Sequence, residues 1–462
     1  MPVLEAAFRV LNPATGEVLA EYAEATAADV EDAVESARRA FIGGGKTAGW
    51  GTTTAERRAA VLRGAAGRLL ERKERLARLA TEEMGKLLAE AVGEVELCAE
   101  IFAYYAEHGP GFLADEPLDH PGAVLQRRPL GPILGIMPWN YPYYQIARFA
   151  APNLMLGNAL LIKPAPACPR SALALEELLL DAGLPAGAYR TVLAGVEQTA
   201  ALVSDPRIQG VSLTGSERAG IAVGTLAGAG LKKSVLELGG SDAFIVLDTE
   251  DLDSVVDLAA AARMENAGQA CTSPKRFIVA ASMYDDFVAG LAAKLAGYVP
   301  GDPRDPGATL APMSSAAAAR TLLAQVDGAV AEGATLLCGG FSTAAGEAYV
   351  SPTLLTDVRP GTRAYREELF GPVAVVYRAE DEDDAVRLAN DSPYGLGASI
   401  FTADAGRADR IAERLEVGMV SVNRLAPSSA ALPFGGVKNS GVGRELGPLG
   451  MDEFVNRKLV VR

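Results

Sequence analysis

The sequence predicts an α/β protein with a parallel sheet and more than one domain. The chain has 462 residues, and at roughly 150 residues per domain this length indicates two to three domains. Apolar residues make up 49% of the chain and charged residues 22%, which excludes wholesale disorder. Between residues 159 and 238, short apolar segments typical of buried strands alternate with helical patterns. Such alternation with short connections indicates right-handed crossovers between parallel strands.

The first hundred residues are predicted to be helical. Thr53 followed by Glu56 fits a capping box, in which a hydroxyl and a carboxylate satisfy backbone groups of the first turn. Apolar residues then recur at the spacing of one helix face. They are Leu62, Ala66, Leu69, Leu76 and Leu79.

Two α/β blocks follow. In the first, strands are expected at 159–163, 191–193, 210–213 and 234–238, with helices at 171–182, 198–203 and 217–227. In the second, a strand is expected at 276–280, with helices at 253–267, 283–295 and 314–333. The stretch 434–462 begins glycine-rich and ends in an alternating pattern that favours an edge strand used in assembly.

The balance of charge and the hydropathy exclude several classes of partner. The 58 acidic and 43 basic residues give a formal net charge of −15, and an acidic surface repels nucleic acid and anionic membranes. No apolar run reaches the ~18–20 residues that a membrane span needs, and the N-terminal stretch lacks the basic flank of a secretory signal. We therefore expect a cytoplasmic protein with no nucleic-acid or membrane partner.

Cysteine and histidine usage narrows the chemistry. The four cysteines lie far apart and form no CxxC pair, which disfavours a disulfide scaffold and a structural zinc site and indicates a reducing environment. His108 and His120 are the two histidines of the chain, and this scarcity nearly excludes metal sites built on several histidines. We expect no metal, and a carboxylate rather than a histidine as any catalytic base.

Cys271 is the first candidate for chemistry. A lone cysteine is usually a small buried hydrophobe. Here Gly268 and Ala270 permit close backbone approach, and the segment is a polar loop ahead of a strand. A cysteine in such a place can be a nucleophile if its thiolate is stabilised. The spacing alone leaves both interpretations open.

Glu237 and Asn140 are candidates for a general base and an oxyanion donor. Glu237 stands in an otherwise apolar strand beside two glycines, where burial would raise its pKa towards that of a general base. An ion-paired core glutamate is the alternative. Asn140 lies between Trp139 and a turn fixed by Pro142, where its amide can be held rigidly for an oxyanion. A turn-forming asparagine is the alternative.

Two strand ends are candidates for binding a phosphate or a ribose. Gly215 and Ser216 stand where a strand passes into a helix, and the free N–H groups of a helix start suit a phosphate, although Ser216 could be a plain N-cap. Lys163 ends a strand of the parallel sheet, where ligands commonly bind, although it could be an exposed loop lysine. The chain has no GxGxxG, so the usual dinucleotide fingerprint is missing.

These signals, taken in their order along the chain, carry a family resemblance. From about Asn12 to about Phe454 the chain resembles the NAD(P)-dependent aldehyde dehydrogenase superfamily. The segments that carry the resemblance are Pro138-Trp139-Asn140, Lys163-Pro164-Ala165, Thr214-Gly215-Ser216, Glu237-Leu238-Gly239-Gly240, Gly268-Gln269-Ala270-Cys271, Glu368-Leu369-Phe370-Gly371-Pro372 and Leu432-Pro433-Phe434-Gly435-Gly436-Val437-Lys438.

The resemblance implies a domain organisation. It implies a Rossmann-like cofactor domain without the usual glycine fingerprint, expected at 1–115 and 130–238. A second α/β domain, expected at 239–436, would carry the catalytic cysteine. A small β extension for oligomerisation is expected at 116–129 and 437–462, and a homodimer or homotetramer would result.

The resemblance also implies roles for single residues. Cys271 would be the nucleophile, Glu237 the general base, and Asn140 an oxyanion donor together with the backbone N–H of Cys271. Lys163 and Glu368 would hold ribose hydroxyls of NAD or NADP, Ser216 the pyrophosphate, and Trp139 and Phe370 the walls of the cofactor site. The neighbouring residues expected to contact the cofactor are Met137, Pro138, Ala165, Pro166, Gly215, Leu238 and Gly239.

The closer resemblance is to the short succinate-semialdehyde dehydrogenases, which implies oxidation of that semialdehyde to its acid through a cysteine thioester. The segments 236–246 and 274–278 are similar to that subgroup. Many NAD-preferring relatives carry a glutamate where this chain has Pro166, and a carboxylate there would repel a 2′-phosphate. NADP is therefore allowed.

Arg148 and three further residues are candidates for the substrate's carboxylate. If Pro142 opens a helix, Asn140, Tyr144 and Arg148 fall near one line at spacings of four, and a guanidinium could grip the carboxylate with two hydrogen bonds. The alternative is that Arg148 pairs with an acidic side chain elsewhere. Ser428 and Ser429 are secondary candidates for the same carboxylate.

Other functions compete with this interpretation. Within the same enzyme class the alternative is a broad-range aliphatic aldehyde dehydrogenase. A thiol esterase using Cys271 and Glu237 would not need the cofactor set of Lys163, Ser216 and Glu368. A non-catalytic descendant of the fold would be expected to have lost Cys271, Glu237 or Asn140, and all three are present.

Overall fold

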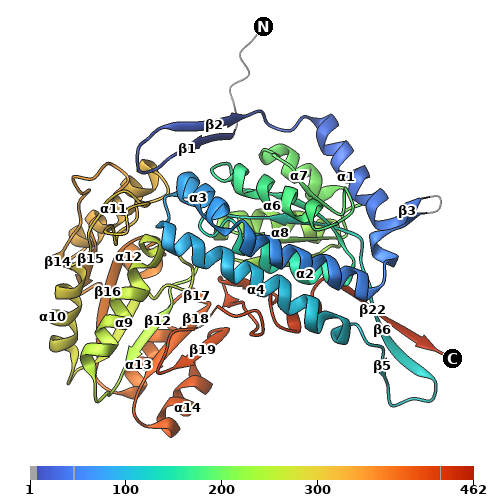
Figure 1. Ribbon diagram of the computed structural model, residues 1–462. Coiled ribbons are helices and arrows are strands. Elements are labelled where there is room, and N and C mark those ends of the chain that lie inside the picture. The colour runs from blue at the N-terminus through green and yellow to red at the C-terminus, as the bar shows by residue number, and fades with distance from the viewer. Residues whose placement is uncertain (1–7, 45–46, 427) are drawn as a thin grey trace.

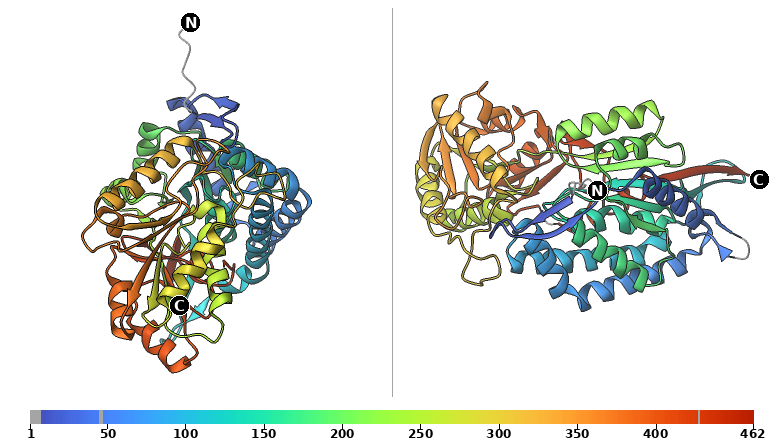
Figure 2. Two further views of the ribbon diagram at one scale, coloured as in Figure 1. Left: turned by 90° about the vertical axis from the view of Figure 1, so that its left-hand side faces the viewer. Right: turned by 90° about the horizontal axis from the view of Figure 1, so that it is seen from above.

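The computed structural model of the chain describes residues 8–44, 47–426 and 428–462. Figure 1 shows two α/β lobes side by side, one built mainly from the first half of the chain and the other mainly from the second. A narrow β arm projects from the first lobe and carries the C-terminus of the described chain (Figures 1 and 2). This division agrees with the predicted α/β class.

The first lobe is built on a mixed sheet of six described strands, in the order β21-β11-β10-β7-β8-β9. The neighbouring pairs from β11 to β9 are parallel, and β21 is antiparallel to β11. The strands are β7 (Pro132–Ile136), β8 (Ala159–Lys163), β9 (Tyr189–Thr191), β10 (Gly210–Thr214), β11 (Lys233–Glu237) and β21 (Gly441–Val442).

Helices cover both faces of this sheet. Successive strand residues point to opposite faces, and the apolar residues on each face are buried against helices. Ile133 packs in the apolar cluster of one helix set and Leu134 in that of the other. The first set is α2 (Ala55–Glu71), α3 (Lys73–Met84), α4 (Leu88–Phe112), α5 (Tyr144–Leu156) and α6 (Pro169–Asp181). The second is α1 (Ala27–Ile42), α7 (Val196–Ser204) and α8 (Glu217–Ala229).

The second lobe has a sheet of seven described strands, in the order β14-β15-β16-β13-β12-β18-β19. All neighbouring pairs are parallel except β14 with β15. The strands are β12 (Ala243–Val246), β13 (Arg276–Ala280), β14 (Thr335–Cys338), β15 (Thr353–Thr356), β16 (Val373–Ala379), β18 (Gly397–Phe401) and β19 (Met419–Val422). Its helices are α9 (Leu252–Met264), α10 (Tyr284–Leu295), α11 (Ala316–Ala331), α12 (Arg363–Arg366), α13 (Glu382–Asn390) and α14 (Ala405–Arg414).

The arm is an antiparallel sheet of β5 (Glu116–Pro117), β6 (Ala123–Pro129) and β22 (Val455–Val461), with β6 in the middle. The remaining short elements are β1 (Phe8–Leu11), β2 (Val18–Tyr22), β3 (Gly43–Gly44), β4 (Thr47–Ala48), β17 (Tyr394–Gly395), β20 (Val437–Lys438) and the 3₁₀ turns Trp50–Thr52, Glu265–Gly268 and Leu449–Met451. Within the described residues, none of the helices has the length and apolar character needed to cross a membrane.

Several expected boundaries are wrong. The residue that caps α2 is Thr54, which accepts from the Arg57 N–H, because the Thr53 hydroxyl donates to the Gly49 carbonyl instead. The apolar stripe expected on one helix is shared by α2 and α3, which meet at Arg72, because both pack on α4. The expected strand 191–193 lies at β9, two residues earlier, and helix 253–267 ends at Met264.

The β extension was expected to include the whole of 437–462, and this range is too long. β20 pairs with β17, and β21 adds to the first lobe's sheet beside β11. Of this range, β22 alone among the described strands joins the arm. The glycine-rich stretch predicted there lets the chain pass close to β11: a Cβ at Gly441 would collide with the Leu236 carbonyl.

Candidate active site

A cavity of about 300 Å³ lies where the two lobes meet, beyond the carboxyl ends of β7, β10 and β11. Ligands of α/β sheets bind at such strand ends. The cavity brings together residues from five separate stretches of the chain. Its lining is Pro138, Trp139, Asn140, Gln145, Thr214, Gly215, Ser216, Leu238, Gly239, Cys271, Glu368 and Phe370.

Cys271 reaches the cavity on a loop that leaves α9 in an unusual backbone conformation. Asn266 and Ala267 have φ values of 51° and 52°, and Gly268 has a φ of 72°. A Cβ at Gly268 would collide with the Gly371 carbonyl, so glycine is required there. Left-handed residues of this kind are costly and cluster at functional sites. The loop thus holds a half-buried free thiol at the wall of the cavity.

Asn140 ties its own turn to the nucleophile loop. Its side-chain amide donates to the Gln269 carbonyl at 3.0 Å, and the Asn266 amide donates to the Asn140 carbonyl at 2.9 Å. An asparagine amide has two N–H donors, so one N–H of Asn140 is left after the bond to Gln269. The predicted rigidity of Asn140 is present, since its side chain is almost completely buried.

Burial raises the pKa of the Cys271 thiol to about 11. The positive charges of Arg148 and Lys275 act in the opposite direction, whereas Glu368 and Asp242 raise the pKa further. The thiol therefore holds its proton near neutral pH until the surrounding charge changes or a base removes it.

Glu237 is the last residue of β11 and is 2% exposed. Neither of its carboxylate oxygens has a hydrogen-bond partner among the described residues. Burial raises the pKa of Glu237 well above its ordinary value, with Arg148 opposing this shift and Glu445 adding to it. A Cβ at Gly435 would stand 2.7 Å from its Oε1, so this glycine leaves room for the carboxylate. An unpaired buried carboxyl is the state expected of a general base.

Arg148 does not reach the cavity, and the expectation that it grips a substrate carboxylate has no support in this geometry. Its side chain is fully buried, forms an ion pair with Glu445, and donates to the Thr214 hydroxyl at 3.3 Å. Its guanidinium lies 4.2 Å from the centre of the Phe434 ring. The alternative weighed from the sequence, an acidic partner elsewhere in the chain, describes what is found.

Replacing Arg148 by methionine is expected to destabilise the protein rather than to weaken substrate binding. The change leaves Glu445 without its cation in a buried site, which costs about 3–5 kcal/mol. Urea unfolding would measure the loss. The double variant Arg148→Met/Glu445→Gln, which removes both charges, should recover most of it. A rise in KM confined to semialdehydes, with stability unchanged, would contradict this.

The other substrate candidates also lie outside the cavity lining. The Tyr144 hydroxyl is buried, and the Tyr144 ring packs edge-on against Tyr141. Ser428 is exposed and Ser429 half-buried, in the loop that follows β19. Their substrate roles therefore stay predictions.

Four of the expected cofactor residues stand beside the cavity rather than in its lining. Lys163 ends β8 and pairs in register with Ile136 of β7, and its carbonyl accepts from the Met137 N–H at 2.9 Å. Burial lowers the pKa of Lys163, with Glu24 opposing the shift. Ala165 is buried and Pro166 exposed just beyond the same strand. They lie at the carboxyl end of β8, the strand next to β7.

Several residues that shape the site were not predicted from the sequence. Gln145 lines the cavity, and its Oε1 is buried without a partner among the described residues. Glu94 of α4 accepts from the N–H groups of Tyr143 and Tyr144, and Glu90 from that of Asn266. Acidic residues along a helix look like a solvated face in sequence, so no signal distinguished them. Gln145 follows Tyr141 by one helical turn, which could have suggested that it faces the site.

The fold and the site together are those of an α/β enzyme with a free cysteine at the wall of its cavity. The model of the Aldehyde dehydrogenase family matches residues 3–460. The chain therefore belongs to the aldehyde dehydrogenase family.

Relatives and solved structures agree with this membership. The chain is 52% identical over 458 residues to a succinate-semialdehyde dehydrogenase [NADP(+)] of Deinococcus radiodurans, covering 99% of this chain and 95% of the relative. It is 43% identical to a succinate semialdehyde dehydrogenase [NAD(P)+] of Escherichia coli, covering 97% and 96%. The crystal structure of succinic semialdehyde dehydrogenase from Streptococcus pyogenes, in complex with NADP+, superposes with a TM-score of 0.95 at 41% identity and covers 98% of this chain and 99% of that one.

Proposed function

We propose that this chain oxidises succinate semialdehyde to succinate with NADP+ as the hydride acceptor. The observation that carries the proposal is the cavity that joins Cys271 and Asn140 to Ser216 and Glu368 at one lobe boundary. The names of the relatives from Deinococcus radiodurans and Escherichia coli support the choice of aldehyde.

The residues of the cavity fit a dinucleotide. Ser216 caps α8 through its hydroxyl and stands at the helix N-terminus, where N–H groups attract a pyrophosphate. A Cβ at Gly215 would meet only Leu213, at 3.8 Å, so the space beside this glycine is open. Trp139 and Phe370 meet edge to face with ring centres 5.9 Å apart and form a wall. When bound, the nicotinamide supplies the hydride acceptor.

Cys271, Asn140 and Glu237 would each carry out a different step of the reaction. The Cys271 thiol gives its proton to solvent, and the thiolate attacks the aldehyde carbon. The resulting oxyanion accepts from the Asn140 amide and the Cys271 backbone N–H, donors worth about 3–4 kcal/mol each. Departure of hydride from the same carbon leaves a thioester on Cys271. Glu237 takes a proton from water, which attacks the thioester and releases the acid with the thiolate as leaving group.

A panel of aldehydes tests the proposal. Succinate semialdehyde, glutarate semialdehyde, hexanal and benzaldehyde are each offered with NAD+ and with NADP+, and the absorbance of the reduced nicotinamide is followed. The proposal expects the highest kcat/KM for succinate semialdehyde with NADP+. An equal or higher value for hexanal would favour the broad-range alternative. Cofactor-independent hydrolysis of a thioester or ester, with no reduced cofactor from any of the aldehydes, would favour a thiol esterase.

Pro166→Glu is expected to shift the cofactor preference towards NAD+. Pro166 is exposed just beyond β8, so a glutamate there needs no repacking. Its carboxylate would repel a 2′-phosphate and could bond the ribose hydroxyls that replace it. The ratio of kcat/KM for NADP+ to that for NAD+ should fall at least tenfold, which is about 1.4 kcal/mol of discrimination. Pro166→Gln, uncharged and of nearly the same size, is the matched control and should change the ratio less.

The assembly, the compartment and the domain roles are part of the same proposal. The lobe containing residues 130–238 would bind the cofactor, the lobe containing 239–436 would carry the nucleophile, and the β5–β6–β22 arm would join subunits of a homodimer or homotetramer. The outward side chains Leu459 and Val461 of β22 are exposed, as expected of a strand that pairs with another chain. A cytoplasmic location fits the four free thiols.

A further inference from the structure

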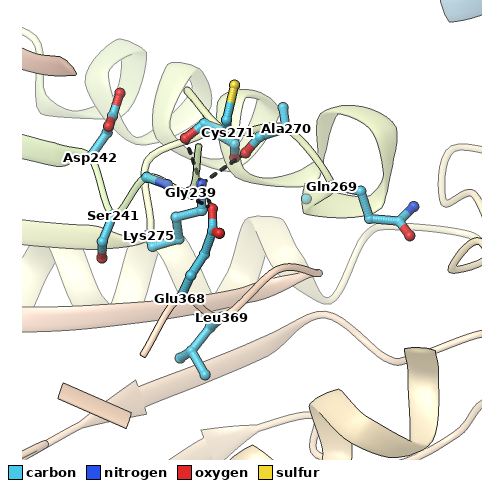
Figure 3. A network of polar contacts seen from close by, with 12 residues as sticks. Gly239, Ser241, Asp242, Gln269, Ala270, Cys271, Lys275, Glu368 and Leu369 are labelled. Atoms are coloured by element: carbon cyan, nitrogen blue, oxygen red, sulfur yellow. Dashed lines mark hydrogen bonds and ion pairs between the residues drawn. The ribbon is translucent and has the colours of Figure 1, made fainter. Parts of the chain in front are cut away.

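Lys275 is a fully buried cation beside the nucleophile. Its ammonium donates to the carbonyls of Ala270 and Cys271, at 2.8 and 2.7 Å, and lies 3.1 Å from the Glu368 carboxylate. Figure 3 shows the three contacts converging on the ammonium from the loop above and the carboxylate below. A buried lysine is rare unless it is paired, and two of the partners here, Cys271 and Glu368, line the cavity.

Two glycines make this arrangement possible. A Cβ at Gly239 would stand 2.7 Å from Glu368 Oε2, and a Cβ at Gly240 would stand 2.5 Å from the Cys271 carbonyl. The Gly240 N–H donates to Glu368 Oε1 at 3.1 Å. The glycine pair after Glu237 therefore brings the carboxylate and the nucleophile's own carbonyl close enough for one ammonium to bind both.

A second buried cation joins the same two loops without facing the thiol. The Arg263 guanidinium donates to the carbonyls of Gly268 and Pro274 at 2.7 and 3.0 Å, and also to that of Gly371. Because Arg263 already holds the nucleophile loop against the 368–371 loop, Lys275 is not needed merely to join them. What Lys275 adds is a positive charge next to Cys271, balanced by the negative charge of Glu368.

We propose that Lys275 is a positioning residue for the Cys271 thiol. Its ammonium, held between the Cys271 carbonyl and Glu368, makes the thiol more reactive, and the Glu368 carboxylate makes it less reactive. The charges that act on the thiol are those of Arg148 and Lys275, which lower its pKa, and those of Glu368 and Asp242, which raise it. Burial lowers the pKa of Lys275 itself, while the negative charge of Glu368 opposes that shift. The inference rests on the proposed role of Cys271 as nucleophile but not on the identity of the aldehyde.

The test reads thiol reactivity in the full chain without aldehyde or cofactor. Iodoacetamide alkylation of Cys271 is followed by mass spectrometry of its peptide between pH 6 and 10, so that the other cysteines do not contribute. Lys275→Gln keeps a hydrogen-bond donor at this position but removes the positive charge. It should move the profile to higher pH, with about a tenfold lower alkylation rate at neutral pH for each unit by which the thiol pKa rises. Glu368→Gln should move the profile to lower pH. Lys294→Gln is the control, because Lys294 pairs with Asp257 on the surface of the same lobe.

The opposite signs distinguish a charge effect from simple damage to the loop. If both variants slow alkylation, or if neither shifts the profile, the proposal is wrong. If Lys275→Gln does not fold, the Glu368→Gln arm decides alone: faster alkylation supports the proposal and slower alkylation overturns it. The alkylation rates do not depend on which aldehyde the protein oxidises. A wrong substrate assignment would therefore not affect this test, and the two failures can be told apart.

Discussion

Replacement of Cys271 by alanine is expected to abolish aldehyde oxidation and to leave NADP+ binding nearly unchanged. In the proposed mechanism the thiol forms the covalent bond to the aldehyde carbon, and no other group lining the cavity, among the described residues, is a comparable nucleophile. The side chain is small and half-buried, so its removal should disturb the cofactor contacts little. Production of reduced nicotinamide gives the activity, and quenching of protein fluorescence by NADP+ gives the dissociation constant.

Cys338→Ala is the matched control for this experiment. Cys338 is also a half-buried free cysteine, but it stands on β14, and its thiol faces the Pro352 carbonyl. Its loss should leave turnover unchanged. Appreciable dehydrogenase turnover by purified Cys271→Ala protein would refute the assignment of the nucleophile.

Replacement of Glu237 by glutamine is expected to slow thioester hydrolysis far more than hydride transfer. Glutamine has nearly the same volume, so the buried pocket should stay filled, but its amide cannot take a proton from water. Rapid mixing should therefore show a burst of reduced cofactor, close to one per site, followed by slow turnover. Loss of one general base typically costs a factor of about 100 to 10,000 in rate.

The pH dependence gives a second check on Glu237. Because burial raises the pKa of this carboxyl, the side chain becomes a competent base only as pH rises through that raised value. Steady-state turnover limited by hydrolysis should therefore increase with pH in the wild type, and this rise should be missing in Glu237→Gln. A variant that keeps both the rate and the rising limb would show that another group activates the water.

Most of the fold could be predicted because the apolar residues follow the strand and helix periodicities clearly in the segments that form the core. β8 and β13 have the predicted bounds, since each is an apolar run buried on both faces of a sheet. The errors fell where tertiary contacts override local pattern. The break at Arg72 could not be seen, because α2 and α3 present one continuous apolar stripe to the same partner, α4.

The site was predictable where its residues sit in short motifs, and not where a distant element completes it. Asn140, Ser216, Glu368 and Cys271 meet at one cavity, as the order of the motifs indicated. The burial of Arg148 against Glu445 depends on a segment almost 300 residues further along the chain and leaves no local trace. Lys275 entered the sequence prediction only within the segment 274–278 that is similar to the succinate-semialdehyde dehydrogenases. A lysine next to an arginine gives no local sign that it will be buried.

The position of β21 also affects how the protein is made. The first lobe is built mainly from early residues, yet β21 forms one edge of its sheet, the Tyr105 hydroxyl donates to the Gly447 carbonyl, and the Asn158 amide donates to the Phe454 carbonyl. Synthesis proceeds from the N-terminus, so β11 keeps an open edge on the ribosome until residues 441–455 have emerged. Open edges recruit strands from other chains, and contacts so distant in sequence form slowly. A nascent chain of this protein therefore exposes a strand edge that favours aggregation until residues 441–455 have been synthesised.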